Sequence, residues 1–159
     1  MILPYLSASI PGVSGTLKTY PEDFYVEEIP AYEPSGTGGH CYLLIEKRGV
    51  PTMRVADQIA KYAGVSGREV GVAGLKDAHA VTRQWFSIWG AAAQKMETMS
   101  LPNVRVLKVS KHLNKLRMGH LRGNRFCIKV RHFEKEQMRH VHDVLELLKT
   151  RGVPNYFGA

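Results

Sequence analysis

The sequence predicts an α+β fold in which helices pack on one face of a mixed or antiparallel sheet. Short runs of apolar residues that alternate with polar ones predict about seven strands, whereas only two stretches show the spacing of a helix. The length of 159 residues suits one ordinary domain or part of a larger one.

The first half of the chain is expected to form four strands and one helix. The strands are predicted at residues 24–29, 40–47, 69–73 and 81–89, and the last of them should place Trp85 and Phe86 on opposite faces. The helix is predicted to start at Thr52, as its N-cap, and to end near Ala63, because Gly64 follows an apolar face of helical spacing.

The second half is expected to form three strands and a helix after a loose link over residues 90–102. The strands are predicted at residues 104–109, 115–121 and 125–133, with a tight turn at Gly123-Asn124 between the last two. Helical spacing then predicts a helix over residues 134–150, marked by Met138, Val141, Leu145 and Leu148.

Positive charge is concentrated in one segment of the chain. Lys and Arg total 22 against 14 Asp and Glu, yet residues 98–133 contain no acid. The basic residues of this segment are Arg105, Lys108, Lys111, Lys115, Arg117, Arg122, Arg125, Lys129 and Arg131. Such a local field indicates a polyanionic partner or an anionic surface, although a merely solvated basic face is the simpler alternative.

Several classes of protein are disfavoured. No apolar run approaches the roughly 20 residues that span a bilayer, and the N-terminus lacks the features of a secretory signal, so a cytoplasmic protein is expected. Cys41 and Cys127 lie far apart in apolar stretches, which predicts buried thiols in a reducing compartment. Motifs for metal or dinucleotide binding are missing, and no basic amphipathic helix suggests a membrane surface.

Asp77 is the first candidate for chemistry. It follows a predicted strand in a glycine-containing turn, with Lys76 beside it and His79 close by. A neighbouring cation would keep the carboxylate ionised and available as a nucleophile or base. The structural alternative is that Asp77 only caps the turn.

Aromatic residues stand among the basic ones. Phe126 follows Asn124 and Arg125, a combination that suits base stacking on single-stranded nucleic acid together with an amide that reads a base edge. An ordinary core aromatic of an alternating strand is the equal alternative for Phe126.

Four ordered stretches carry a family resemblance. Residues 73–84 (AGLKDAHAVTRQ) closely resemble the signature of the TruD family of tRNA pseudouridine synthases. Residues 18–28, 121–126 and 152–158 resemble three further motifs of that family, in the same order. The resemblance runs from about Gly15 to the last residue.

The resemblance implies a pseudouridine synthase fold and a reaction without cofactor or metal. Family members convert a uridine of tRNA, at position 13, to pseudouridine: the N1–C1′ bond breaks, the uracil turns, and C5 joins C1′. Asp77 would be the catalytic aspartate, acting either on C1′ or on the C2′ proton of an extruded nucleotide. An enclosed pocket would retain the detached base.

Further site residues follow from the resemblance. Phe126 corresponds to the aromatic that stacks on the target base, and Asn124 and Phe24 to residues that line the substrate pocket. Lys18 corresponds to a basic residue near the catalytic aspartate, where it would either hold a phosphate or stabilise the carboxylate. Lys76 would only shape the local field. Ala78 departs from the family, in which many members have a basic residue, so one phosphate contact is in doubt.

The resemblance also implies a domain assignment. Residues 1–159 would be the N-terminal part of the catalytic domain, with an insertion domain and the C-terminal part of the catalytic domain outside this chain. The chain alone is therefore expected to be inactive. The alternative function is a catalytically silent RNA-binding domain that acts as a tRNA chaperone, but such a domain has no need for the Lys76-Asp77 turn. The sequence says nothing of the oligomeric state.

Overall fold

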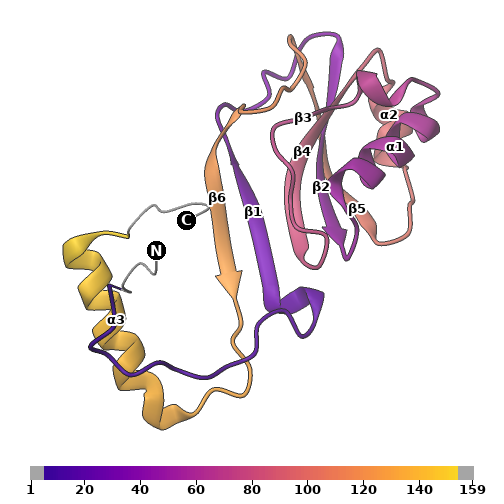
Figure 1. Ribbon diagram of the computed structural model, residues 1–159. Helices are drawn as coiled ribbons and strands as arrows, with labels where there is room; N and C mark the ends of the chain where they lie inside the picture. Colours follow the sequence, from indigo (N-terminus) through magenta and orange to yellow (C-terminus); the bar gives the residue numbers. More distant parts are fainter. Residues whose placement is uncertain (1–5, 154–159) are drawn as a thin grey trace. The chain divides into compact units, whose positions relative to one another are not determined.

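The computed structural model describes residues 6–153, which separate into two compact units (Figure 1). Residues 18–129 form one unit, which contains the sheet and the sequence-predicted site residues. The described part of the other unit combines residues 6–17 with residues 130–153. The stretch Asn155-Tyr156-Phe157-Gly158, which belongs to one of the four motifs, lies outside the described residues.

The sheet of the first unit is mixed. Its strands are β1 (Phe24–Pro30), β2 (His40–Arg48), β3 (Gly71–Val72), β4 (Val81–Trp89), β5 (Val104–His112) and β6 (Leu121–Ile128). Their order is β5-β2-β4-β1-β6, and β3 also pairs with β4. The β1–β4 pair is parallel and the other pairs are antiparallel. The prediction of an α+β fold with a mixed sheet is therefore confirmed.

Two helices cover one face of this sheet, α1 (Thr52–Ala63) and α2 (Ala93–Glu97) (Figure 1). The main core lies beneath them, where Val55 and Ile59 of α1 pack with Phe86 of β4. A smaller cluster around Tyr42 and Trp85 covers the opposite face. Because successive strand residues alternate between faces, Trp85 and Phe86 enter different clusters, as predicted.

The prediction of two strands joined by a turn at Gly123-Asn124 is wrong. Both residues lie inside β6, where Gly123 pairs with Ile29 and Asn124 with Glu28 of β1. Residues 115–120 form a loop instead of a strand. Gly123 keeps an ordinary backbone conformation there, so pairing with β1 overrides the local preference for a turn.

Several smaller expectations also need correction. Residues 90–102 contain the short helix α2, which the sequence did not suggest. The N-cap of α1 is Pro51, so Thr52 is the first helical residue and its hydroxyl is free for other partners. Cys41 is buried as predicted, but Cys127 is exposed because the end of β6 carries nothing over it in the described residues.

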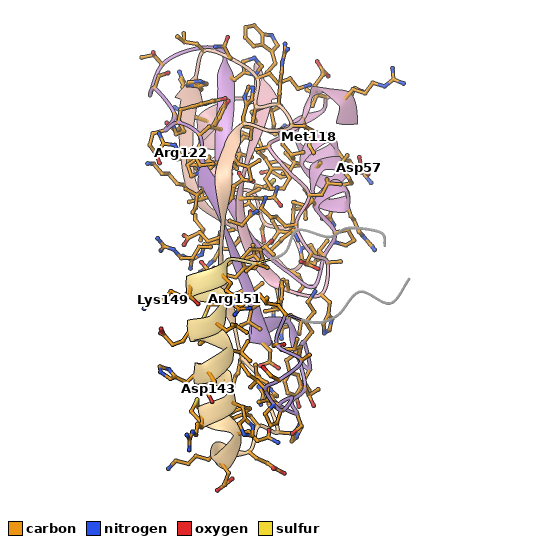
Figure 2. All side chains as sticks on the ribbon, turned by 60° about the vertical axis from the view of Figure 1, so that its left-hand side comes forward. Asp57, Met118, Arg122, Asp143, Lys149 and Arg151 are labelled. Atoms are coloured by element: carbon orange, nitrogen blue, oxygen red, sulfur yellow. The ribbon has the colours of Figure 1, made fainter. Side chains whose placement is uncertain are left out.

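The second unit contains α3 (Met138–Arg151), which follows a 3-10 turn at Lys135–Gln137. Asp143, Lys149 and Arg151 project from this helix in Figure 2. Two more 3-10 turns, Pro21–Asp23 and Gly67–Glu69, lie in the first unit. Over residues 6–153, no helix combines the length and the apolar character needed to cross a membrane.

Candidate active site

Asp77 lies in the loop that connects β3 to β4 and forms an ion pair with Lys18. The Lys18 Nζ atom is 2.8 Å from Asp77 Oδ1 and 4.0 Å from the centroid of the Phe24 ring. The ammonium group therefore contacts a carboxylate and an aromatic face together. The Asp77 side chain is 44% exposed, so a substrate can reach its carboxylate.

The backbone at Lys18 has an uncommon conformation. Its φ angle of 57° lies in the left-handed region, which costs a non-glycine residue about 1 kcal/mol or more. His79, from the same loop as Asp77, donates its Nε2–H to the Lys18 carbonyl at 2.9 Å. The Asp77 loop thus holds Lys18 through its main chain as well as through its ammonium group.

An aromatic pair continues the site. Phe24 at the start of β1 and Phe126 on β6 lie edge to face, with 6.0 Å between ring centroids. Phe126 is 54% exposed, so it is not an ordinary core aromatic in the described part of the chain. Asn124 lies two residues before Phe126 in β6, on the same face because strand side chains alternate.

Lys76 does not contribute the cation beside Asp77, contrary to what its place in the sequence suggested. Its Nζ atom lies 2.8 Å from Glu28 Oε2, and both side chains are almost fully buried. The second carboxylate oxygen of Glu28 accepts the Trp85 main-chain N–H at 3.2 Å. On this side of β4, residues 81–83 pair with β1 and residues 86–87 pair with β3. The Trp85 N–H lies between these two stretches, and Glu28 supplies the acceptor that a neighbouring strand would otherwise provide.

Buried polar side chains hold the main chain of the Asp77 loop. Lys47 Nζ donates to the Asp77 carbonyl at 2.8 Å, and Gln84 Nε2 donates to the Gly74 carbonyl at 3.1 Å. The Thr52 hydroxyl accepts the Lys76 N–H at 2.9 Å and donates to Gln84 Oε1, also at 2.9 Å. The loop is therefore fixed at three main-chain positions by groups that belong to β2, β4 and α1.

Lys47 is unusual because it is fully buried. Burial lowers the pKa of its ammonium group to about 8, an effect that the Asp77 carboxylate partly offsets and Lys76 increases. A buried lysine of this kind requires specific hydrogen-bond acceptors, and the Asp77 carbonyl supplies one of them.

The motifs of the sequence do not point to Lys47, Glu28 and Gln84, although the pattern of the strands carries a signal for them. In β2 the residues facing the helices are Cys41, Leu43, Ile45 and Lys47, so a lysine takes a core position. Gln84 likewise shares its face of β4 with buried Phe86, and Glu28 shares its face of β1 with buried Val26. Charged or amide side chains in the inward register of strands indicate a buried polar network.

The five sequence-predicted residues thus gather in one region of the first unit. Asp77, Lys18, Phe24 and Phe126 form a continuous series of contacts, and Asn124 shares the face of Phe126. A carboxylate beside an exposed aromatic ring suits chemistry on a stacked base or its sugar. Among the described residues, no three metal-ligating side chains come together.

Known proteins share much of this sequence. The family model described as tRNA pseudouridine synthase D (TruD) matches residues 2–159. A tRNA pseudouridine synthase D of Geobacter sp. (strain M21) is 49% identical over 154 residues, which cover 97% of this chain and 39% of that protein. One from Thermus thermophilus is 48% identical over 158 residues, covering 98% of this chain and 44% of that protein.

A solved structure shows the same fold. The crystal structure of a TruD protein from Methanosarcina mazei matches with a TM-score of 0.89 at 30% sequence identity, over 98% of this chain and 37% of that one. The chain therefore spans about two fifths of the length of the relatives it matches. On the strength of the family model and these relatives, the chain belongs to the TruD family.

Proposed function

We propose that this chain supplies the part of a tRNA pseudouridine synthase that carries the catalytic carboxylate. One observation supports this best: the exposed Asp77 carboxylate is paired with Lys18 next to the edge-to-face pair of Phe24 and Phe126. The reaction is an isomerisation in which the N1–C1′ bond of a uridine breaks and a C5–C1′ bond forms. The proton lost from C5 goes to solvent, and N1 gains one.

Each side chain has a role in this proposal. Asp77 acts on the sugar of an extruded nucleotide, either by attack at C1′ or by removal of the C2′ proton, and both need an ionised carboxylate. The Phe126 ring stacks on the uracil, and the Asn124 amide reads its edge. Lys18 keeps the Asp77 carboxylate oriented in the absence of substrate.

The remaining wall of the pocket is proposed to come from residues outside this chain. A detached uracil has to be retained, but Asp77 is open to solvent here, and the relatives are more than twice as long. We therefore assign residues 1–159 to the N-terminal part of a catalytic domain that is completed by further sequence. Its substrate is tRNA, at position 13, in the cytoplasm.

The test joins residues 1–159 to the remaining part of the Geobacter sp. relative. Turnover is measured as tritium release from tRNA labelled at C5 of uridine. The Asp77→Asn variant is expected to lower the rate at least about 10³-fold, as removal of a covalent or acid–base catalyst does. Asp57→Asn is the matched control, because Asp57 is an exposed residue of α1 (Figure 2).

The outcomes separate the two functions. Loss of turnover in Asp77→Asn with unchanged tRNA affinity supports the synthase. A rate within about tenfold of the control would overturn the role of Asp77. If the unsubstituted chimera is folded and binds tRNA but releases no tritium, the binding-domain alternative replaces the synthase.

A further inference from the structure

A second basic site lies on the face of the sheet opposite the helices. His40 begins β2 and pairs in register with His112 at the end of β5. Because Cys41 faces the main core, His40 and Tyr42 point to the other face, whereas Lys47, which holds the Asp77 loop, points to the helix side. His40 and Lys47 also belong to opposite ends of β2. The site is therefore distinct from the Asp77 region.

A surface pocket of about 360 Å³ is present here, within the size range of small-ligand sites. Its lining contains two histidines, a lysine and an arginine, and none of the described lining residues is acidic: His40, Leu113, Asn114, Lys115, Arg117 and His120. Lys115, Arg117 and His120 come from the acid-free segment 98–133, and an anion is the complementary ligand of this lining.

Hydrogen bonds around the pocket fix some of these groups and leave others available. His120 Nδ1 is 2.7 Å from the Tyr32 hydroxyl, which leaves its Nε2 atom for a ligand. Lys115 Nζ donates to the Arg68 carbonyl and retains further N–H groups. Tyr32 also stacks on His112 with 5.0 Å between centroids, so the histidine side of the pocket is held in place.

His40, one of the lining residues, lies in a positive environment. Its Nδ1 atom is buried and has no hydrogen-bond partner in the structure, although its ring packs against Trp89. An unpaired buried polar atom destabilises the folded chain. Burial lowers the pKa of His40, and Lys115 and His112 lower it further, so the ring lies in an uncompensated positive field.

We propose that the pocket lined by His40, Lys115, Arg117 and His120 binds a phosphate group of an RNA backbone. The phosphate oxygens would accept hydrogen bonds from Lys115, Arg117 and the Nε2–H of His120, and the charges of the two cations would be neutralised. Lys115 and Arg117 are the fixed positive charges of the hollow, and the negatively charged phosphate of an RNA backbone is complementary to them. That RNA is the source of the phosphate rests on the proposed function, whereas the anion site itself does not.

The test follows the histidine side chains of the 159-residue chain by NMR. The chain is titrated with inorganic phosphate and, separately, with a short single-stranded RNA. Binding is expected to shift the resonances of His40 and His120 and to raise the pKa of His40, because an adjacent anion favours the protonated ring. The RNA should saturate these shifts at a concentration at least tenfold lower than phosphate does.

Matched variants then test whether the pocket is a site or part of a diffuse charge. Arg117→Gln is expected to weaken RNA binding at least fivefold, and His40→Gln provides a second, uncharged probe. Arg122→Gln is the control, because Arg122 is an exposed arginine of the same basic segment that does not line the pocket (Figure 2). Its effect should stay below about twofold, since a single exposed phosphate contact contributes little.

Every result bears on the proposal. No shift at His40 or His120 with either ligand would overturn the site. Saturation by inorganic phosphate at or below the RNA concentration would overturn RNA as the source, and equal losses in Arg117→Gln and Arg122→Gln would replace the pocket by a diffuse surface. Since none of these titrations requires turnover, failure of the synthase assay leaves the outcome here unaffected.

Discussion

Substitution of Glu28 by Gln is expected to destabilise the first unit strongly. Glu28 accepts a hydrogen bond from the Lys76 ammonium at 2.8 Å and another from the Trp85 N–H at 3.2 Å. Only 1% of the Glu28 side chain and 4% of the Lys76 side chain are exposed. Gln keeps the shape of Glu and one acceptor oxygen, but it removes the negative charge that compensates the buried ammonium.

The expected cost is about 3–5 kcal/mol, the range for removing one partner of a buried ion pair. That is a large part of the roughly 5–15 kcal/mol by which an ordinary domain is stable. Glu27→Gln is the matched control on the neighbouring residue. Glu27 pairs with Arg125 at 3.7 Å, and the Arg125 side chain is 73% exposed, so this change should cost about 1 kcal/mol or less.

Urea unfolding measures both changes, with Trp fluorescence as the signal because Trp85 binds Glu28 directly. The double variant Glu28→Gln/Lys76→Met should recover at least half of the loss, since it leaves no uncompensated charge. If Glu28→Gln costs no more than Glu27→Gln, the Glu28–Lys76 pair does not stabilise the loop and the reasoning fails.

Two further changes probe the groups that hold Asp77. The pKa of Lys47 is about 8 in the folded chain and about 10.5 in the unfolded chain, so the unfolded state binds more protons between these values and stability rises with pH there. The free energy of unfolding of the unsubstituted chain should therefore rise by about 3 kcal/mol between pH 8 and 10.5, and Lys47→Met should abolish this rise. Urea unfolding of both proteins at several pH values measures it. If the difference in stability between the two proteins does not depend on pH, the lowered pKa of Lys47 is contradicted. Lys18→Gly should leave the melting temperature unchanged or raise it, because glycine adopts the left-handed backbone of Lys18 without strain, yet it should slow tritium release by the chimera at least tenfold. A lowered melting temperature with full activity would refute the role given to the ammonium group.

The elements that the sequence predicted best are those with a regular pattern and clear ends. The bounds of α1 and β4 agree with the prediction because an apolar face of helical period ends at Gly64 and because Val81–Trp89 alternates throughout. The turn at Gly123-Asn124 failed since a local dipeptide preference cannot reveal that β1, about a hundred residues earlier, pairs across it.

The candidate site was likewise only partly predictable from the sequence. Resemblance supplied Asp77, Lys18, Phe24, Asn124 and Phe126, but residue order alone assigned the wrong cation, because adjacent residues in a loop direct their side chains differently. Lys76 turns into the sheet toward Glu28, and Lys18 approaches from a segment almost sixty residues earlier. The fold shows that Lys18 pairs with Asp77 and that Lys76 pairs with Glu28.

The buried polar residues explain why the sheet is built as it is around Asp77. Lys47, Gln84 and Glu28 take inward positions on three adjacent strands, where apolar side chains would stabilise the core more. Each of them instead bonds to the Asp77 loop or to the main chain beside it. A loop that is fixed at its main chain keeps its carboxylate in place before substrate binds, which lowers the reorganisation that catalysis requires. The buried polar side chains therefore lie around the proposed catalytic residue. This is expected if the core is less stable there than an apolar core would be, in exchange for a fixed orientation of the Asp77 carboxylate.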